Sequence, residues 1–309
     1  MSDSNADLDQ PIAAREKSMR SAGPSLYLVG TPIGNLEDIT LRALRVLKEV
    51  DVIACEDTRQ TQKLLNHYAI TTRTTSYHEH NEMTRSAELV KEIQEGASVA
   101  LVTDAGMPGI SDPGFRLIAL AIRHHVPVVP IPGASAFLSA LVASGLPTDS
   151  FRFSGFLPAK RGERRAALEA IKSSPRTQVF YEAPHRIVET LEDVCEVLGD
   201  TRDVVIAREV TKLHEEFLRG TVAEIRQALA SRDTVRGEIT LLVQAPAELV
   251  ARGEASASKE KIADRVARIG AEAGVDEKEA LKRLARELGQ SKSELYRELQ
   301  RERARIRAR

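Results

Sequence analysis

The amino-acid sequence predicts an α/β protein of two α/β domains in series, followed by a small all-helical domain. The chain has 309 residues, enough for roughly two domains and an appendage. Between residues 25 and 245, short apolar runs alternate with segments of helical periodicity, which is typical of α/β folds. Gly- and Pro-rich loops follow four of the apolar runs. Ligands of such folds bind where loops converge at strand ends, so we expect a ligand cleft between the two domains.

Changes in composition predict the divisions of the chain. Residues 1–24 are polar and lack sustained periodicity, and the segment after residue 245 is rich in Ala, Gly and Ser. The predicted divisions are a flexible leader (1–24), a first α/β domain (25–145), a boundary at GLPTDS (145–150), a second α/β domain (151–245), a linker (246–258) and a basic helical appendage (259–309).

The first domain opens as strand, turn, helix and strand. Ser25–Val29 is an apolar run, Gly30–Asn35 is a turn, and Leu36–Val50 has apolar residues at helical spacing. We expect one helix over Leu36–Val50, with Asn35 as its N-cap. The next apolar run, Asp51–Cys55, follows at once, which indicates a parallel sheet.

The same alternation predicts the later elements. Helices are expected at 58–68, 81–95, up to 125, up to 144, 160–172, 184–198 and 222–230. Strands are expected at 98–102, 126–131, 151–156, 178–181, 204–207, 215–219 and 238–243.

The C-terminal appendage has a helix-turn-helix pattern. Glu279–Leu288 is followed by Gly289 and then by Ser291 and Glu294, which form the pattern of a helix stop and a capping box. Residues 251–309 carry 16 Lys and Arg against 11 Asp and Glu. Such a unit can contact nucleic-acid phosphates, but a helical hairpin used for dimerisation or to cover a cleft fits the pattern equally well.

Composition restricts the setting of the protein. The formal net charge is −1, so the whole chain does not attract nucleic acid. Cys55 and Cys195 are the only cysteines; two isolated cysteines suit a reducing compartment, and we expect both to be buried core residues. The N-terminus lacks a signal-peptide pattern, and no apolar run has the ~20 residues of a membrane span. We therefore expect a cytoplasmic protein.

The first Gly-rich loop is not a phosphate cradle. It has only Gly30 and Gly34, and Pro32 removes a backbone N–H where a pyrophosphate needs a donor, which argues against a dinucleotide site. No Gly-Lys-Ser/Thr follows, so a Walker loop is excluded. What remains is a loop suited to close backbone approach by a ligand with little phosphate.

Five motifs together resemble a known family. They are VGTPIGNLEDITLRA (29–43), ACEDTR (54–59), TDAGMPGISDPG (103–114), VPIPGASA (129–136) and YEAPHR (181–186). They are similar to the ribosomal RNA small subunit methyltransferase I group of the tetrapyrrole methylase superfamily. The resemblance covers about residues 25–245 and implies two α/β domains that enclose S-adenosylmethionine in the cleft between them.

The resemblance also implies which residues bind this cofactor, largely through main-chain groups. Carried over by motif, they are Ile33, Gly106, Ile110, Ser111, Ser135, Ala136, Tyr181 and Glu182, with Thr240 added from the stretch GEITLL (237–242). Relatives of the tetrapyrrole type carry an Asp in the long loop where this chain has Met107. Asp104 or Asp112 is expected to supply the missing carboxylate.

The reaction implied by the family is methyl transfer to the ribose 2′-hydroxyl of a cytidine in the decoding region of small-subunit rRNA, with no metal. A 2′-hydroxyl needs a group that takes its proton, and the candidates are Glu56, Asp57 and His80. The alternative for the two carboxylates is an exposed loop that pairs with Arg59. The His-Glu-His segment at 78–80 lacks the spacing of a helical metal site.

Partner predictions follow from the cations and from the family. We expect RNA phosphates to contact Arg59, Lys160, Arg161, Arg164, Arg165, Arg297 and Arg301. Cations at the start of the helix 160–172 oppose its dipole and so suggest an external anion. The substrate is small-subunit rRNA or the assembled small ribosomal subunit, and the family implies a homodimer.

Two other functions fit parts of the sequence. A methyltransferase of a tetrapyrrole or another small molecule has no need of the basic appendage. A ligand-sensing helix-turn-helix regulator needs base-reading residues, which the sequence does not identify.

Overall fold

A computed structural model describes residues 24–246, 262–288 and 290–307. The chain divides into two compact units, residues 1–245 and residues 246–309, which are described separately. The predicted leader 1–24, apart from Pro24, most of the linker 246–258 and Gly289 lie outside the described residues. Among the helices described, none is long and apolar enough to cross a membrane.

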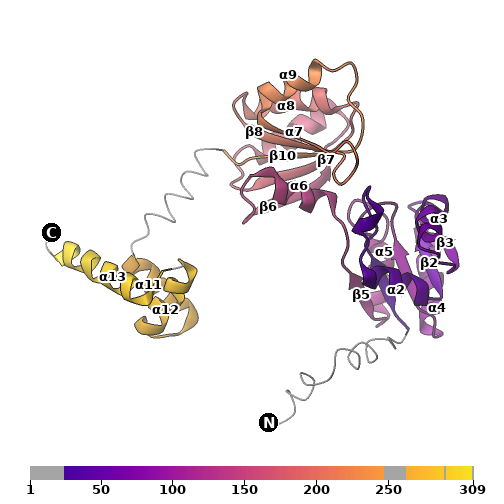
Figure 1. Ribbon diagram of the computed structural model, residues 1–309, viewed down its shortest axis with the longest axis horizontal. Coiled ribbons are helices and arrows are strands. Elements are labelled where there is room, and N and C mark those ends of the chain that lie inside the picture. The colour runs from indigo at the N-terminus through magenta and orange to yellow at the C-terminus, as the bar shows by residue number, and fades with distance from the viewer. Residues whose placement is uncertain (1–23, 247–261, 289, 308–309) are drawn as a thin grey trace, which may run out of the picture. The chain divides into compact units, whose positions relative to one another are not determined.

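The first half of the larger unit contains a five-stranded parallel sheet of order β3-β2-β4-β1-β5 (Figure 1). Its elements are β1 (Leu26–Val29), the 3-10 turn η1 (Leu36–Asp38), α2 (Leu41–Glu49), β2 (Val52–Cys55), α3 (Thr58–His67), β3 (Thr74–Ser76), α4 (Glu82–Gln94), β4 (Val99–Val102), α5 (Phe115–Arg123) and β5 (Val128–Ile131). Successive strand residues face opposite sides of the sheet. Tyr27 and Ile53 pack with α2 and α3, whereas Leu26 and Val52 pack with α4 and α5.

The single helix expected over Leu36–Val50 is wrong. Asn35 caps only η1, where its side chain accepts a hydrogen bond from the backbone N of Glu37 at 3.1 Å. The chain is extended at Ile39 and Thr40, and the Thr40 hydroxyl then caps α2 by accepting from Ala43 N. Because Thr40 is also a good N-cap residue, the α-helix begins only after it.

The second half contains a mixed five-stranded sheet of order β6-β7-β10-β8-β9. Only β6 and β7 are parallel, and the other pairs are antiparallel. The elements are α6 (Ala136–Ser144), β6 (Phe151–Phe156), α7 (Arg161–Ile171), β7 (Thr177–Glu182), α8 (Ile187–Leu198), β8 (Asp203–Arg208), β9 (Glu216–Thr221), α9 (Val222–Ala230) and β10 (Ile239–Val243).

Helices cover both faces of this second sheet. Helices α7, α8 and α9 pack on one face, and α6 packs on the other against Val179, Val205 and Leu242 (Figure 1). Arg219 of β9 donates to the carbonyl oxygens at the end of α6. Helix α6 precedes the expected boundary at 145–150 but packs on the second sheet, because its apolar residues, Phe137 and Leu141 among them, cover that face.

The two cysteines differ in burial. Cys55 on β2 is fully buried, as predicted. Cys195 on α8 is only partly buried, so the prediction of a core residue is wrong there; it lies at the edge of the apolar cluster beneath α8.

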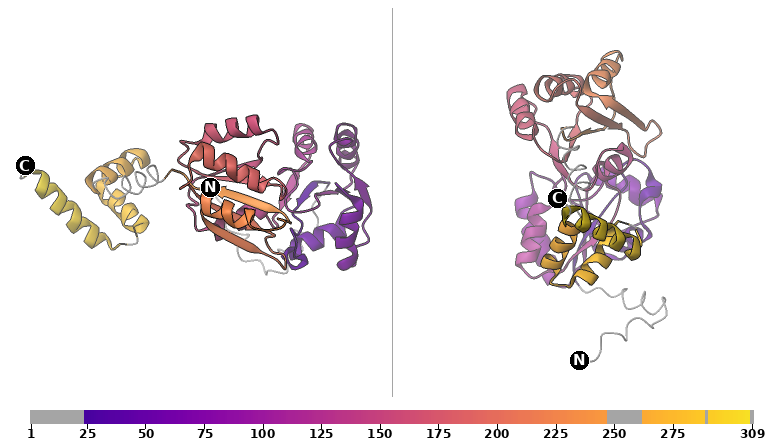
Figure 2. Two further views of the ribbon diagram at one scale, coloured as in Figure 1. Left: turned by 90° about the horizontal axis from the view of Figure 1, so that it is seen from above. Right: turned by 90° about the vertical axis from the view of Figure 1, so that its left-hand side faces the viewer.

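The C-terminal unit has a small helical core. Helices α11 (Ile262–Ala273), α12 (Glu277–Glu287) and α13 (Lys292–Arg307) pack together, as both views in Figure 2 show. Buried residues from all three form the core, among them Val266, Leu284 and Leu295. The predicted capping box is confirmed, because Ser291 Oγ accepts from Glu294 N at 3.2 Å and Glu294 Oε2 accepts from Ser291 N at 3.2 Å.

Candidate active site

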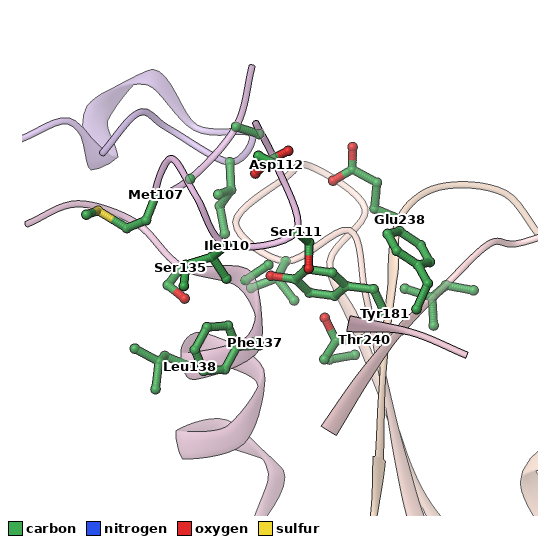
Figure 3. A pocket seen from close by; sticks show the side chains of 18 of the residues that line it. Met107, Ile110, Ser111, Asp112, Ser135, Phe137, Leu138, Tyr181, Glu238 and Thr240 are labelled. Atoms are coloured by element: carbon green, nitrogen blue, oxygen red, sulfur yellow. The ribbon is translucent and has the colours of Figure 1, made fainter. Parts of the chain in front are cut away.

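A cavity of about 840 Å³ lies where loops and strands from both sheets of the larger unit meet (Figure 3). Three loops at the carboxyl ends of β1, β4 and β5 line one side. The other side is lined by the end of β7, the start of β10 and the segment after β8. This volume falls in the range of small-molecule sites, about 300–1,000 Å³.

Backbone contacts hold the three loops of the first sheet together. Thr31 N donates to Gly106 O at 2.9 Å, and Gly106 N donates to Thr31 O at 3.1 Å. A Cβ on Gly30 would lie 2.7 Å from Gly133 Cα, closer than real Cβ contacts, so these two loops touch only because both residues are glycine. The loops therefore present main-chain groups to the cavity.

The long loop 103–114 adopts left-handed backbone at the cavity. Gly106 has φ +88°, and Ser111 has φ +60°, a conformation that L side chains rarely adopt. The Ser111 hydroxyl lies against β6, because a Cβ on Gly155 would be 3.3 Å from Ser111 Oγ. The loop thereby connects the two sheets across the cavity.

Aromatic side chains form an apolar wall. Phe137 stacks on Phe153 with ring centroids 4.4 Å apart, and Tyr181 packs edge-on against Phe153 at 4.9 Å and beside Phe156 at 5.7 Å. Burial raises the pKa of the Tyr181 phenol, which keeps it protonated at neutral pH.

The structure brings together most residues predicted to bind the cofactor. Nine of them line this one cavity: Ile33, Gly106, Ile110, Ser111, Ser135, Ala136, Tyr181, Glu182 and Thr240. The Glu182 carboxylate does not face a ligand, since it is buried and accepts from Thr190 Oγ1 at 2.7 Å and from Arg186. Only the backbone of Glu182 is available to the cavity.

Asp104 is not among the lining residues, contrary to its predicted cofactor contact. It is exposed on the loop after β4, and its Oδ1 accepts from the backbone N of Asp57 at 3.2 Å. Asp112 lines the cavity instead, so the sequence alternative between these two carboxylates resolves toward Asp112 as the cavity residue.

Three carboxylates at this edge of the first sheet, Glu56, Asp104 and Asp112, form a cluster that we call the pocket carboxylates. Partial desolvation raises the pKa of all three, and repulsion between carboxylates raises it further: Asp57 acts on Asp104, Asp104 acts on Glu56, and Glu56 acts on Asp112. The pKa of Asp112 is raised to about 6. Thr103 Oγ1 lies 3.4 Å from Glu56 Oε2 and opposes the rise for both Glu56 and Asp112.

The structure argues against Asp57 as the proton acceptor. Its carboxylate caps α3 and binds the Arg59 guanidinium at 2.7 Å, and these contacts lower its pKa to about 2. A carboxylate with so low a pKa is a weak base. Arg59 is correspondingly engaged with Asp57, although its side chain is 86% exposed.

His80 does not line the cavity, and its ring lies 5.9 Å from that of His78. Glu56 does not line the cavity either, but its charge acts on Asp112, which does. In the described part of the chain, no group of three His, Cys, Asp or Glu side chains is arranged to hold a metal ion.

The basic run 160–165 on α7 contacts carboxylates of its own fold. Arg164, predicted to contact RNA, is fully buried and binds Asp193 at 2.7 Å and Glu189 at 2.7 Å, so that prediction is wrong. Arg161 and Arg165 pair with Glu196 of α8, at 3.0 and 2.8 Å. Lys160 pairs with Glu163 at 3.2 Å. The negative charge that these cations suggested therefore comes mainly from α8 of the same chain.

Glu238 precedes β10 and lines the cavity. It was not among the residues predicted from the sequence to bind the cofactor. Its carboxylate pairs with Lys212 at 3.1 Å, and Lys212 packs against the loop at Gly34. The GEITLL stretch that indicated Thr240 also contains Glu238, and a charged residue beside a strand-end glycine was the available signal. Arg297 and Arg301 are exposed on α13 of the C-terminal unit.

Comparisons with known proteins agree with the motifs. The family described as Tetrapyrrole (Corrin/Porphyrin) Methylases matches residues 25–226. A protein of Halalkalibacterium halodurans named ribosomal RNA small subunit methyltransferase I is 50% identical over 272 residues, covering 88% of this chain and 93% of that protein. The chain belongs to the tetrapyrrole methylases, in the group of this relative. The family resemblance found in the motifs is confirmed.

Other relatives of this methylase extend the result. A Bacillus subtilis protein of the same name is 44% identical, covering 88% of this chain and 92% of that protein. The crystal structure of a conserved hypothetical protein from Aeropyrum pernix matches with a TM-score of 0.59 at 21% identity, covering 75% of this chain and 89% of that one, which supports the fold. The predicted α/β class with an added helical unit is confirmed, and the protein is a methyltransferase.

S-adenosylmethionine is the methyl donor of this family, and the cavity fits it. Within the described residues no Lys or Arg lines the cavity, which suits a ligand without phosphate. The loop glycines leave room for a ligand beside the backbone, and Asp112 and Glu238 supply negative charge beside a cationic cofactor.

Proposed function

We propose that this methylase transfers a methyl group from S-adenosylmethionine to the ribose 2′-hydroxyl of a cytidine in the decoding region of small-subunit (16S) rRNA. The observation that carries the proposal is the match, over 88% of the chain, to a relative named for small-subunit rRNA methylation. The cytidine and the 2′-oxygen follow from the motif resemblance, and the cavity supports a single small-molecule donor.

The residues of the chain act mainly by positioning. When bound, S-adenosylmethionine supplies a methyl group already activated by its sulfonium charge. The loops at Thr31, Gly106 and Ser135 hold the donor through main-chain groups, and the aromatic wall at Phe137 and Tyr181 excludes water. Holding the ribose oxygen in line with the methyl carbon and sulfur removes much of the entropic barrier.

Methyl-labelled S-adenosylmethionine distinguishes this function from the small-molecule alternative. The protein is incubated with assembled small subunits, with bare 16S rRNA or with a corrinoid precursor, and labelled RNA is mapped by nuclease digestion and mass spectrometry. We expect label in one cytidine as a 2′-O-methyl group. Label in the corrinoid and none in either RNA substrate contradicts the proposal.

We also propose that RNA contacts come partly from the C-terminal unit. Helix α13 exposes Arg297 and Arg301, and its unit has its own helical core, so it can present these charges as a rigid surface. Cations on a helix attract phosphates, and each contact releases counterions. A reaction on ribosomal RNA implies a cytoplasmic location.

A homodimer is the third part of the proposal. Large apolar side chains are exposed on α5, with Phe115 at 79% and Ile122 at 59%, and on α6, with Val142 at 75%. Large apolar side chains exposed on two helices favour burial against a second copy of the chain. Sedimentation equilibrium is expected to give a dimer mass for the wild type and a monomer mass for Phe115→Glu. A monomeric wild type contradicts this part of the proposal.

A further inference from the structure

The cavity has three acidic lining residues, and only one has a carboxylate available for a proton. The Glu182 carboxylate is buried and saturated by Thr190, Arg186 and its neighbour's backbone N–H. The Glu238 carboxylate pairs with Lys212. Asp112 is half-buried, and among the described residues no Lys or Arg pairs with it.

We propose that Asp112 is the catalytic base of the methyl transfer, accepting the proton of the nucleophilic hydroxyl. The inference rests on the proposed function and adds the residue that carries out its proton transfer. It replaces Asp57 and His80, which do not line the cavity, by a carboxylate that does. It also places the base on the loop that carries Gly106 and Ser111 at the donor site, so donor and base are positioned by one segment.

The surroundings of Asp112 keep its carboxylate basic. Glu56 after β2 and Thr103 and Asp104 after β4 act on Asp112, and the charge of Asp112 in turn raises the pKa of Tyr181 on β7. Burial and the two neighbouring carboxylates raise its pKa to about 6, against one hydrogen bond from Thr103 that lowers it. A base with a pKa near the working pH is still ionised at neutrality and takes a proton more readily than an ordinary carboxylate.

The hydroxyl of Thr103 can stabilise only one of two neighbouring carboxylates at a time. One hydroxyl donates one hydrogen bond, and Thr103 is within reach of both Glu56 and Asp112. Only one of the two receives its proton at a time, and in the structure the hydroxyl donates to Glu56 at 3.4 Å. Glu56 is thus a positioning residue, which acts on the reaction through the charge it places beside Asp112.

Proton transfer to Asp112 accompanies the transfer of the methyl group. The hydroxyl O–H bond breaks and its proton moves to an Asp112 oxygen, while the ribose oxygen forms a bond to the methyl carbon. The bond from that carbon to sulfur breaks with its electron pair on sulfur, which leaves a neutral thioether product. The proton on Asp112 then exchanges with water.

Single-turnover methylation of small subunits as a function of pH tests the proposal. For the wild type we expect the rate to rise with pH up to about 6 and to level off above it. Asp112→Asn is expected to lower the plateau rate by about a hundredfold or more, a much larger effect than the loss of one negative charge beside S-adenosylmethionine has on the affinity for that cofactor. Asp112→Glu is expected to recover part of the rate. The exposed Asp233→Asn, the matched control, is expected to behave as the wild type.

Glu56→Gln separates a charge effect from a structural one. Removing its charge relieves repulsion on Asp112, so the acid limb of the profile is expected to move to lower pH while the variant retains activity. A loss of rate at every pH without movement of the limb contradicts the role of Glu56. Thermal unfolding at pH 7.5 checks that each variant is folded.

Two outcomes distinguish a failure of the Asp112 proposal from a failure of the proposed function. If the wild type methylates small subunits and Asp112→Asn retains a near-normal rate and pH profile, Asp112 is not the base and the proposed function stands. If the wild type methylates no rRNA substrate but binds the donor, the proposed function fails and takes this inference with it.

Discussion

The pocket carboxylates and the basic run 160–165 are both clusters of like charge, but only the second is neutralised by its own fold. Among the described residues no Lys or Arg pairs with Glu56, Asp104 or Asp112, and the pKa of each is raised. The basic run is matched by Asp193, Glu189 and Glu196 across α7 and α8.

Charge that is left without counter-charges lies near the chemistry of this molecule. A cluster that the protein leaves uncompensated costs stability at neutral pH, because repulsion and burial disfavour its charged form. A cluster with matched counter-charges holds two helices together and has little charge left for a ligand. The uncompensated cluster borders the cavity, and the compensated one does not.

The largest effect is expected at the cavity itself, from Gly106→Arg. Gly106 has φ +88° and lies with its Cβ position 3.6 Å from Ile33, so a long side chain both strains the loop and fills the space beside the cofactor. Calorimetry in the presence of a chelator is expected to find S-adenosylmethionine binding in the wild type and none in the variant. Gly162→Ala, on α7 with open space around its Cβ position, is the control and should bind normally. Binding by Gly106→Arg contradicts the cavity as the donor site.

Arg164→Met tests the compensated cluster. Removing a fully buried cation takes from the buried Asp193 one of its two partners and leaves only Arg161, at 2.9 Å, so the free energy of unfolding is expected to fall by about 3 kcal/mol. Arg165→Met, which breaks a half-exposed pair with Glu196, is expected to cost about 1 kcal/mol or less. Urea denaturation measures both. If Arg164→Met weakens RNA binding at unchanged stability, the run contacts RNA rather than α8.

Charge reversal on the C-terminal unit tests whether the exposed cations Arg297 and Arg301 bind RNA. The double variant Arg297→Glu/Arg301→Glu is expected to weaken binding of small-subunit rRNA about tenfold. The slope of the salt dependence is expected to become shallower by about 0.7 for each phosphate that the variant no longer binds. Arg226→Glu, on α9, is the control for reversal of one exposed charge outside the C-terminal unit. An unchanged salt slope in the double variant shows that α13 does not contact phosphates.

The smallest effect is expected from Lys160→Ala. The Lys160 side chain is 82% exposed and pairs with Glu163 in its own helix. Its removal is expected to change RNA affinity by about threefold or less, since Lys160 can bind one phosphate at most. A change of tenfold or more, measured by filter binding at the same salt, places RNA on α7 and removes the contrast between the two clusters.

The sequence was informative where the signal is local. Short apolar strands followed by glycine loops predicted the first sheet, and the loop motifs predicted nine residues that line one cavity. The burial of Arg164 depends on carboxylates 25 and 29 residues away on α8, which spacing within α7 does not indicate. The proximity of Glu56 to Asp112 depends on β2 and β4 being neighbours in the sheet, which is a long-range pairing.

The ionisation of Asp112 tests the central contrast most directly. Carboxyl-carbon NMR of the aspartate-labelled protein is followed from pH 3 to pH 8, and the resonance missing in Asp112→Asn identifies the residue. Because burial and its neighbours disfavour the charged form, we expect that resonance to titrate with a midpoint of about 6, while Asp57, held by Arg59 at a pKa of about 2, stays ionised over most of this range. A midpoint for Asp112 at the ordinary value of 3.8 contradicts the account, since the cluster is then compensated like the one on α7.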